Sequence, residues 1–113
     1  GTCIRDYVHV EDLASAHLLA LKHLANGGES RTYNLGSGNG FSVREIISAC
    51  EKASGRSIPV TLAGRRAGDP ARLVADSAAI RRDWGWEPQW TDVVDIARHA
   101  WTWMEAHPEG YKQ

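Results

Sequence analysis

Strand-like and helix-like patterns alternate along this chain of 113 residues, and this alternation limits the fold more than any other feature. In the segment CIRDYVHV, residues 3–10, apolar and polar side chains alternate, which is typical of a strand. From Asp12 the apolar residues recur at helical spacing up to Leu24. We therefore predict an α/β fold, a small mixed sheet packed by helices. The predicted strands lie near 3–10, 31–36 and 58–63, and the predicted helices near 12–26, 42–54 and 91–106.

Capping signals mark where the later helices begin and end. Ser42 with Glu45 forms the S-x-x-E pattern of a capping box, which predicts the start of a helix. Gly55 is expected to end that helix, because glycine readily adopts the left-handed conformation found at helix C-termini. A short helix capped by Asp76 is expected to end in the same way at Gly85.

Composition and charge argue against several classes of function. The formal net charge of −1 gives no electrostatic basis for binding nucleic acid or an anionic membrane. No apolar run approaches the ~20 residues that a membrane-spanning helix needs. The two cysteines, Cys3 and Cys50, fall in an apparent strand and an apparent helix, without metal-binding spacing. We therefore expect two reduced thiols and a cytoplasmic location.

The loop RRAGDP, from Arg65 to Pro70, is the strongest local signal for ligand binding. Arginine donates paired hydrogen bonds that match phosphate oxygens, and Gly68 lets the backbone approach a ligand closely. The carboxylate of Asp69 only accepts hydrogen bonds, which suits the hydroxyls of a ribose. The same residues would also make a solvated turn with an Arg–Asp ion pair of little energetic value. From spacing alone, that solvated turn ranks first.

Arg5 is the second candidate for phosphate binding. It lies in a strand-like segment among mostly apolar neighbours and beside Asp6. Pairing with a nearby carboxylate and binding of a phosphate are about equally well supported before any family is considered. Arg81, by contrast, is expected on a solvated helix face and serves as a reference arginine.

The glycine-rich loop Gly36–Gly40 resembles a dinucleotide-binding fingerprint only superficially. The pattern G-x-G-x-x-G would need glycine at position 41 or 43, where Phe41 and Val43 stand. A tight connection into the following helix explains the glycines better. The histidines lack the i, i+4 spacing of a helical metal site, so no metal site is assigned.

Five motifs in order resemble the C-terminal part of UDP-glucose 4-epimerases, members of the extended short-chain dehydrogenase/reductase family. The resemblance runs essentially the whole length of the chain. RDYVHV and YNLG are shared more widely among nucleotide-sugar epimerases and dehydratases, whereas RRAGD with the terminal HPEGY favours the UDP-glucose 4-epimerases. His107 stands where the family often has asparagine, a small departure near the end. The motifs are RDYVHVEDLASAH at 5–17, YNLGSGNGFSV at 33–43, RRAGDP at 65–70, DWGWEP at 83–88 and WTWMEAHPEGY at 101–111.

The resemblance implies a reaction and a set of contacts. In such enzymes a tightly held NAD oxidises the sugar at C4, the keto-sugar rotates, and hydride returns to the other face. The resemblance places Arg5 and Arg66 on the diphosphate and Asp69 on the ribose hydroxyls. It also places Tyr7 near the nucleotide, in the same strand motif as Arg5.

The catalytic and cofactor parts of the family have no counterpart in this sequence. The family's Tyr-x-x-x-Lys pair would need tyrosine four residues before a lysine, but Leu18, Ser48 and Pro108 stand there. We therefore assign no catalytic residue and no cofactor-binding residue, and we expect NAD only in the intact family enzyme.

The sequence leaves three functions open. The first is the substrate-binding part of an epimerase that interconverts UDP-glucose and UDP-galactose, inactive alone. The others are a stand-alone nucleotide-sugar-binding module and a generic α/β interaction domain. The first is favoured because Gly1 leads straight into a strand-like segment. On this hypothesis residues 1–113 form the C-terminal nucleotide-sugar-binding domain without the N-terminal NAD-binding domain. The expected partners are a UDP-sugar, that NAD-binding half and a second copy of the chain.

Overall fold

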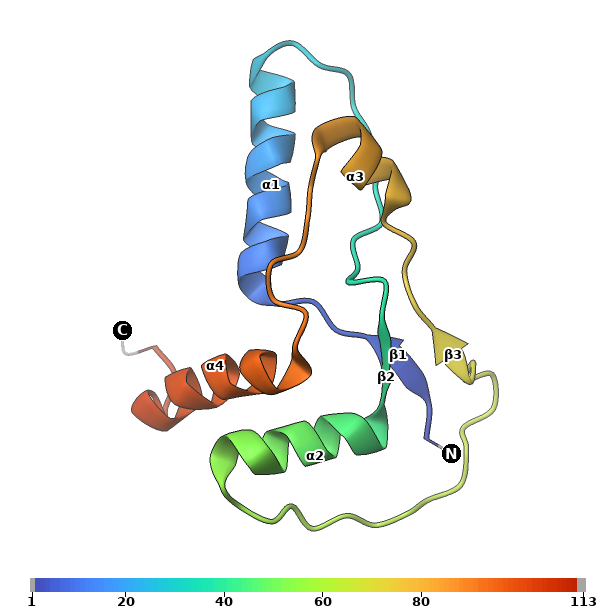
Figure 1. Cartoon of the computed structure of the whole chain (residues 1–113), viewed down its shortest axis with the longest axis vertical. Helices are drawn as coiled ribbons and strands as arrows, with labels where there is room; N and C mark the ends of the chain where they lie inside the picture. Colours follow the sequence, from blue (N-terminus) through green and yellow to red (C-terminus); the bar gives the residue numbers. More distant parts are fainter. Residues whose placement is uncertain (1, 112–113) are drawn as a thin grey trace.

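A three-stranded mixed sheet with β1 (Ile4–Asp6) at its centre joins the two ends of the fold (Figure 1). This computed structural model describes residues 2–111, so Gly1, Lys112 and Gln113 of the predicted domain lie outside the described residues. β1 pairs antiparallel with β2 (Gly40–Ser42) and parallel with β3 (Arg72–Leu73). The predicted small mixed sheet of an α/β fold is therefore confirmed.

The four helices lie in two pairs, one at each end of the sheet (Figure 1). α1 (Val10–Ala25) and α3 (Ala78–Trp84) enclose a small core of Ala16, Ile80 and Trp86. α2 (Val43–Ser54) packs against α4 (Val93–Ala106) at the other end. The radius of gyration is 16.9 Å, against about 13 Å for a compact domain of this length. The chain is therefore open, and large apolar side chains stay exposed.

The helices follow most of the predicted capping signals. α3 is an exception at its start, because its N-cap is Ser77 and not the predicted Asp76, although Asp76 Oδ1 accepts from Ala78 N across 2.9 Å. Ser42 and Glu45 form the capping box that begins α2, with Glu45 N donating to Ser42 Oγ across 3.1 Å. Gly55 and Gly85 end α2 and α3 in the left-handed conformation, as predicted. α1 differs, because the Nδ1 atom of His9 caps it by accepting from Glu11 N across 3.0 Å. Asp12, where the sequence placed the start of this helix, lies in its first turn.

Asp12 is buried and joins α1 to the segment that follows α3. Its carboxylate accepts from the backbone amides of Gln89 (2.8 Å) and Trp90 (3.0 Å). Its carbonyl oxygen accepts from the indole nitrogen of Trp86 (3.0 Å). A buried carboxylate is stable only when its oxygens are hydrogen-bonded, and here both are.

Two of the three strand predictions are wrong in position. Residues 31–36 and 58–63 form no strand, and β1 is shorter than the predicted 3–10. Residues 31–36 instead bring Tyr33 and Leu35 onto the core between α1 and α3. Residues 60–63 instead line a groove beside α2 and belong to no strand of the described sheet. Glycine at position 40 lets β2 approach β1 closely, because a Cβ added there would overlap Ile4 of the neighbouring strand.

Candidate functional site

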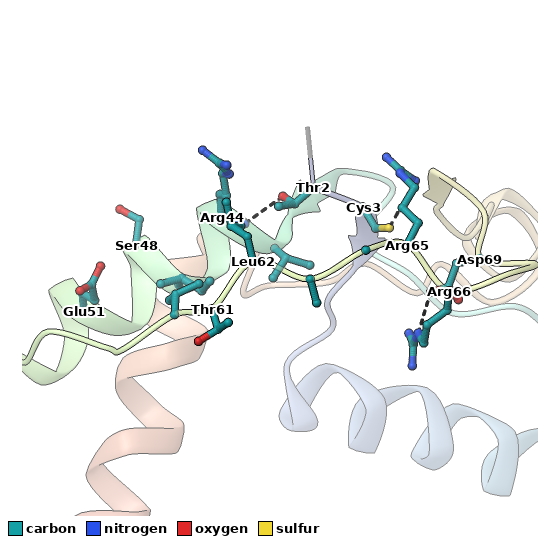
Figure 2. A pocket seen from close by; sticks show the side chains of 15 residues that line it. Thr2, Cys3, Arg44, Ser48, Glu51, Thr61, Leu62, Arg65, Arg66 and Asp69 are labelled. Atoms are coloured by element: carbon teal, nitrogen blue, oxygen red, sulfur yellow. Dashed lines mark hydrogen bonds and ion pairs between the residues drawn. The ribbon is translucent and has the colours of Figure 1, made fainter.

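A groove of about 880 Å³ opens between the start of α2 and the segment that leads into the RRAGDP loop (Figure 2). Its walls carry three arginines and two carboxylates, so positive charge is in slight excess. Arg44 and Arg65 point to one side in Figure 2, whereas Arg66 points to the other. The polar side chains that line the groove are Thr2, Arg44, Ser48, Glu51, Thr61, Arg65, Arg66 and Asp69.

Arg66 and Asp69 form an ion pair on the wall of this groove. Arg66 Nε lies 2.9 Å from Asp69 Oδ2, and the two side chains are 85% and 28% exposed. A backbone bond from Asp69 N to Arg66 O (3.3 Å) closes the turn between them. No other hydrogen bond of the Arg66 guanidinium occurs among residues 2–111. The two terminal nitrogens of Arg66 are therefore available to an anion while Nε holds Asp69.

Arg5 lies in the central strand, and its Nη1 atom donates to the carbonyl of Ile4 across 2.8 Å. Tyr7 is half-buried directly after β1. Within the described part of the chain, no hydrogen bond or ion pair joins Arg5 or Tyr7 to Arg66 or Asp69. The structure thus brings two of the four predicted site residues together and keeps the other two on a neighbouring strand.

The backbone nevertheless ties that strand to the RRAGDP loop. Ile4 N donates to Ala71 O across 2.9 Å, directly after the loop. The parallel register then places Arg5 opposite Leu73 of β3. Sequence analysis missed this connection because a two-residue strand carries no periodic signal.

Two further arginines line the groove, and the sequence singled out neither as a site residue. Arg44 follows the capping box, and its amide donates to Thr2 Oγ1 across 3.1 Å. Arg65 was noted only as part of its loop, and its Nη1 lies 3.8 Å from the sulfur of Cys3. Cys3 and Cys50 are free thiols, as predicted. No pattern in the sequence places these side chains in one groove, because they come from three separate segments.

Arg81 is not the solvated residue that the sequence suggested. It is half-buried and donates to Ser77 Oγ (3.0 Å) and to the carbonyl of Ser37 (3.4 Å). Its guanidinium also lies 5.8 Å from the ring centre of Trp86, within the range of a cation–π contact. A substitution at Arg81 would disturb the core, so this residue is unsuitable as a reference arginine.

The glycine-rich loop does not fit a dinucleotide. The strand β2 separates it from α2, whereas the fingerprint opens directly into a helix. The first amides of α2 are also engaged, since Arg44 N binds Thr2 and Glu45 N binds Ser42. The glycine-rich loop therefore lacks the geometry of the pyrophosphate-binding turn in that fingerprint.

Comparisons with known proteins show what this chain is similar to. Residues 1–36 match the NAD dependent epimerase/dehydratase family. UDP-glucose 4-epimerase of Halalkalibacterium halodurans is 50% identical over 111 residues, which is 98% of this chain and 33% of that protein. A crystal structure of UDP-glucose 4-epimerase matches 100% of this chain and 34% of its own, at a TM-score of 0.94 and 56% identity. Over nearly its whole length, this chain resembles UDP-glucose 4-epimerases at about half identity.

A further UDP-glucose 4-epimerase, from Bifidobacterium longum, is described in complex with NAD+ and UDP. It matches 97% of this chain and 32% of its own, at a TM-score of 0.83 and 38% identity. The chain thus spans about a third of the length of the UDP-glucose 4-epimerases it matches. The predicted family and the predicted family cofactor, NAD, are confirmed.

Two other features of this chain concern metals and membranes. Across residues 2–111, no group of three or more histidine, cysteine or acidic side chains is arranged to hold a metal ion. None of the described helices has the length and apolar character needed to cross a bilayer.

Proposed function

We propose that this chain forms the UDP-sugar-binding part of an enzyme that interconverts UDP-glucose and UDP-galactose. Residues 1–113 would act as its C-terminal nucleotide-sugar-binding domain. Arg5 and Arg66 bind the diphosphate, Asp69 binds the ribose hydroxyls, and Tyr7 lies beside the nucleotide. The observation that carries the proposal is the exposed Arg66 guanidinium, held by Asp69 through Nε alone.

The energetics favour a phosphate on Arg66. An exposed ion pair such as Arg66–Asp69 contributes about 0–1 kcal/mol. A charge-assisted hydrogen bond to a phosphate contributes about 1.5–3 kcal/mol. Phosphate binding therefore outweighs the ion pair if the two compete, and the terminal nitrogens of Arg66 allow both to exist together. The Oδ1 atom of Asp69 then accepts from a ribose hydroxyl.

Binding by this chain alone is expected to be weak. Two arginine contacts must offset the loss of ligand freedom and the ordering of exposed side chains. The uracil contacts of the family come mainly from segments outside this sequence. We therefore expect a dissociation constant on the order of millimolar for UDP.

The chain is proposed to work with an NAD-binding half that supplies the hydride carrier and the Tyr/Lys pair. NAD, when bound there, accepts and returns the hydride, while this chain binds and orients the nucleotide end of the substrate. By itself the chain would be inactive. We place the intact enzyme in the cytoplasm, in keeping with free thiols at Cys3 and Cys50.

Exposed apolar side chains support such a partner. Leu18 and Leu21 on α1 are 65% and 64% exposed, and Leu62 and Met104 are also exposed. Leu18 and Leu21 line the same groove on α1, and an exposed apolar patch is typical of an interface. A second copy of the chain is the partner available in the absence of the NAD-binding half.

A UDP titration followed by NMR tests the proposal. Shifts at Arg5, Arg66 and Asp69 would support it. Saturable binding without any epimerase activity in the intact gene product would favour the stand-alone module. No response to any uridine nucleotide would favour the interaction domain.

A further inference from the structure

Asp6 is the last residue of β1, and its carboxylate joins three separate segments. Oδ1 accepts from Ser37 N (2.9 Å) and from Ser37 Oγ (2.7 Å). Oδ2 accepts from Ala75 N (3.2 Å) and from Gly38 N (3.4 Å). This half-buried carboxylate is held in place by four donors, because a shift of the carboxylate would leave several of these donors without an acceptor.

Because Asp6 is next to Arg5 in β1, its hydrogen bonds also affect the position of Arg5. Successive side chains of a strand point to opposite faces, so Asp6 holds β1 from the face opposite Arg5. Ala75 follows β3 by two residues, and β3 follows the RRAGDP loop. The carboxylate therefore fastens the strand that carries Arg5 to the segment that carries Arg66 and Asp69.

The other links between these segments include the bond from Ile4 N to Ala71 O, the contact of Arg65 with Cys3 and the short β1–β3 ladder. β3 has two residues, both exposed, and its parallel pairing with β1 covers Ile4 and Arg5 only. A parallel pair of this length is marginal by itself. Gly36 also packs closely against Asp6 and Ala75, because a Cβ added at Gly36 would overlap Asp6 Oδ2 and the side chain of Ala75. The connection between β1 and the segment after the RRAGDP loop thus depends on the Asp6 carboxylate more than on the β ladder.

We propose that Asp6 is a positioning residue for the UDP-sugar site, and this inference rests on the function proposed above. Asp6 touches no ligand. It sets the separation of Arg5 and Arg66, so that one diphosphate engages both arginines. Loss of the carboxylate should therefore affect ligands that need both arginines more than ligands that need one.

The test compares UDP with UMP, because only UDP carries the second phosphate. The variants are Asp6→Asn and, as a control with the same change of charge, Asp95→Asn on α4. An asparagine accepts on one side only, so it must place its amide group against Ser37 or against Gly38 and Ala75. Binding is followed by NMR on the isotope-labelled chain, with circular dichroism to establish that each variant is folded.

We expect the unsubstituted chain to bind UDP about tenfold more tightly than UMP. In Asp6→Asn this preference should fall towards one, while the affinity for UMP changes by less than about twofold. Asp95→Asn should keep the preference. General loss of structure would instead weaken both nucleotides alike, so the ratio separates positioning from stability. If Asp6→Asn does not fold, Ser37→Ala removes one of the four donors and should lower the ratio in the same direction.

The outcomes separate this inference from the proposed function. A folded Asp6→Asn chain with an unchanged preference for UDP would overturn the inference and leave the proposed function standing. Equal affinity for UDP and UMP in the unsubstituted chain would contradict the two-arginine geometry and overturn the inference. Binding of neither nucleotide would contradict the proposed function, and the inference would fall with it.

Discussion

Arg66 and Asp69 pair with each other across 2.9 Å on an exposed loop that lines the groove. A second pair of the same kind, Arg98 with Asp95 at 2.6 Å, lies on α4 outside that groove. Both pairs join residues three positions apart and both are exposed to solvent. The chain therefore contains its own control for the role of the first pair, since only the first is expected to bind phosphate.

Asp12 should be among the residues most important for stability. Asp12→Ala would leave the part-buried backbone amides of Gln89 and Trp90 without their acceptor, at about 1–3 kcal/mol each. We expect a loss of about 2–4 kcal/mol in the free energy of unfolding, measured by urea denaturation with tryptophan fluorescence. Asp95→Ala, which removes an exposed ion pair, should change it by less than about 1 kcal/mol. Equal effects of the two substitutions would contradict the assigned role of Asp12.

The hydrogen bond from Tyr33 to Asp83, at 2.8 Å, should make stability depend on pH at both extremes. It lowers the pKa of Asp83, with help from Arg82, and it raises the pKa of Tyr33 above 10.0. The Asp83 contribution is present above the pKa of the unfolded carboxyl and is lost as pH falls through the folded value. The Tyr33 contribution is present below pH 10.0 and is lost as pH rises through its folded pKa.

Tyr33→Phe tests this dependence. The difference in urea midpoint between the unsubstituted chain and Tyr33→Phe should be largest near neutral pH. It should shrink both in strong acid and above pH 10.0. Tyr111→Phe, at a highly exposed position, should show no such profile. A difference for Tyr33→Phe that does not change with pH would mean that the hydrogen bond is not responsible.

The purified chain should carry no NAD and should not turn over UDP-galactose. The reason is that the glycine-rich loop is separated from α2 by β2, and no Tyr-x-x-x-Lys pair is present in the sequence. Absorbance of denatured protein and an enzymatic assay for released NAD provide the measurement. Stoichiometric NAD, or epimerisation by the chain alone, would contradict the proposed division of roles.

The chain should self-associate as its concentration rises. Leu18 and Leu21 form part of an exposed apolar surface on α1, and burial of such surface favours association. Multi-angle light scattering should show a mass above that of the monomer, and Leu18→Ser with Leu21→Ser should lower it. A monomer at high concentration would argue against this surface as an interface.

The helices could be predicted from the sequence because their ends are encoded locally. The Ser42–Glu45 capping box and the glycines at 55 and 85 act within one turn of the helix they limit. The strands could not, because β2 and β3 are defined by pairing with β1 and are three and two residues long. Residues 58–63 have the composition of a strand but no strand to pair with.

The candidate site was predictable in part for the same reason. Arg66 and Asp69 are three residues apart, so the sequence suggested both their ion pair and their ligand role. Asp6 binds Ser37 and Ala75, which lie 31 and 69 positions further along the chain, and no local pattern reveals contacts over such separations. Arg81 was misjudged because its partner Ser37 lies 44 positions away.

UDP titration of the chain with Arg66→Ala and Arg98→Ala tests the central claim most directly. NMR shifts in the unsubstituted chain should appear at Arg5, Arg66 and Asp69 and should weaken as salt rises. Arg66→Ala should reduce the affinity by about tenfold or more, because a charge-assisted contact is lost. Arg98→Ala should leave it unchanged. Shifts confined to other parts of the chain, or equal affinity in all three proteins, would contradict the account.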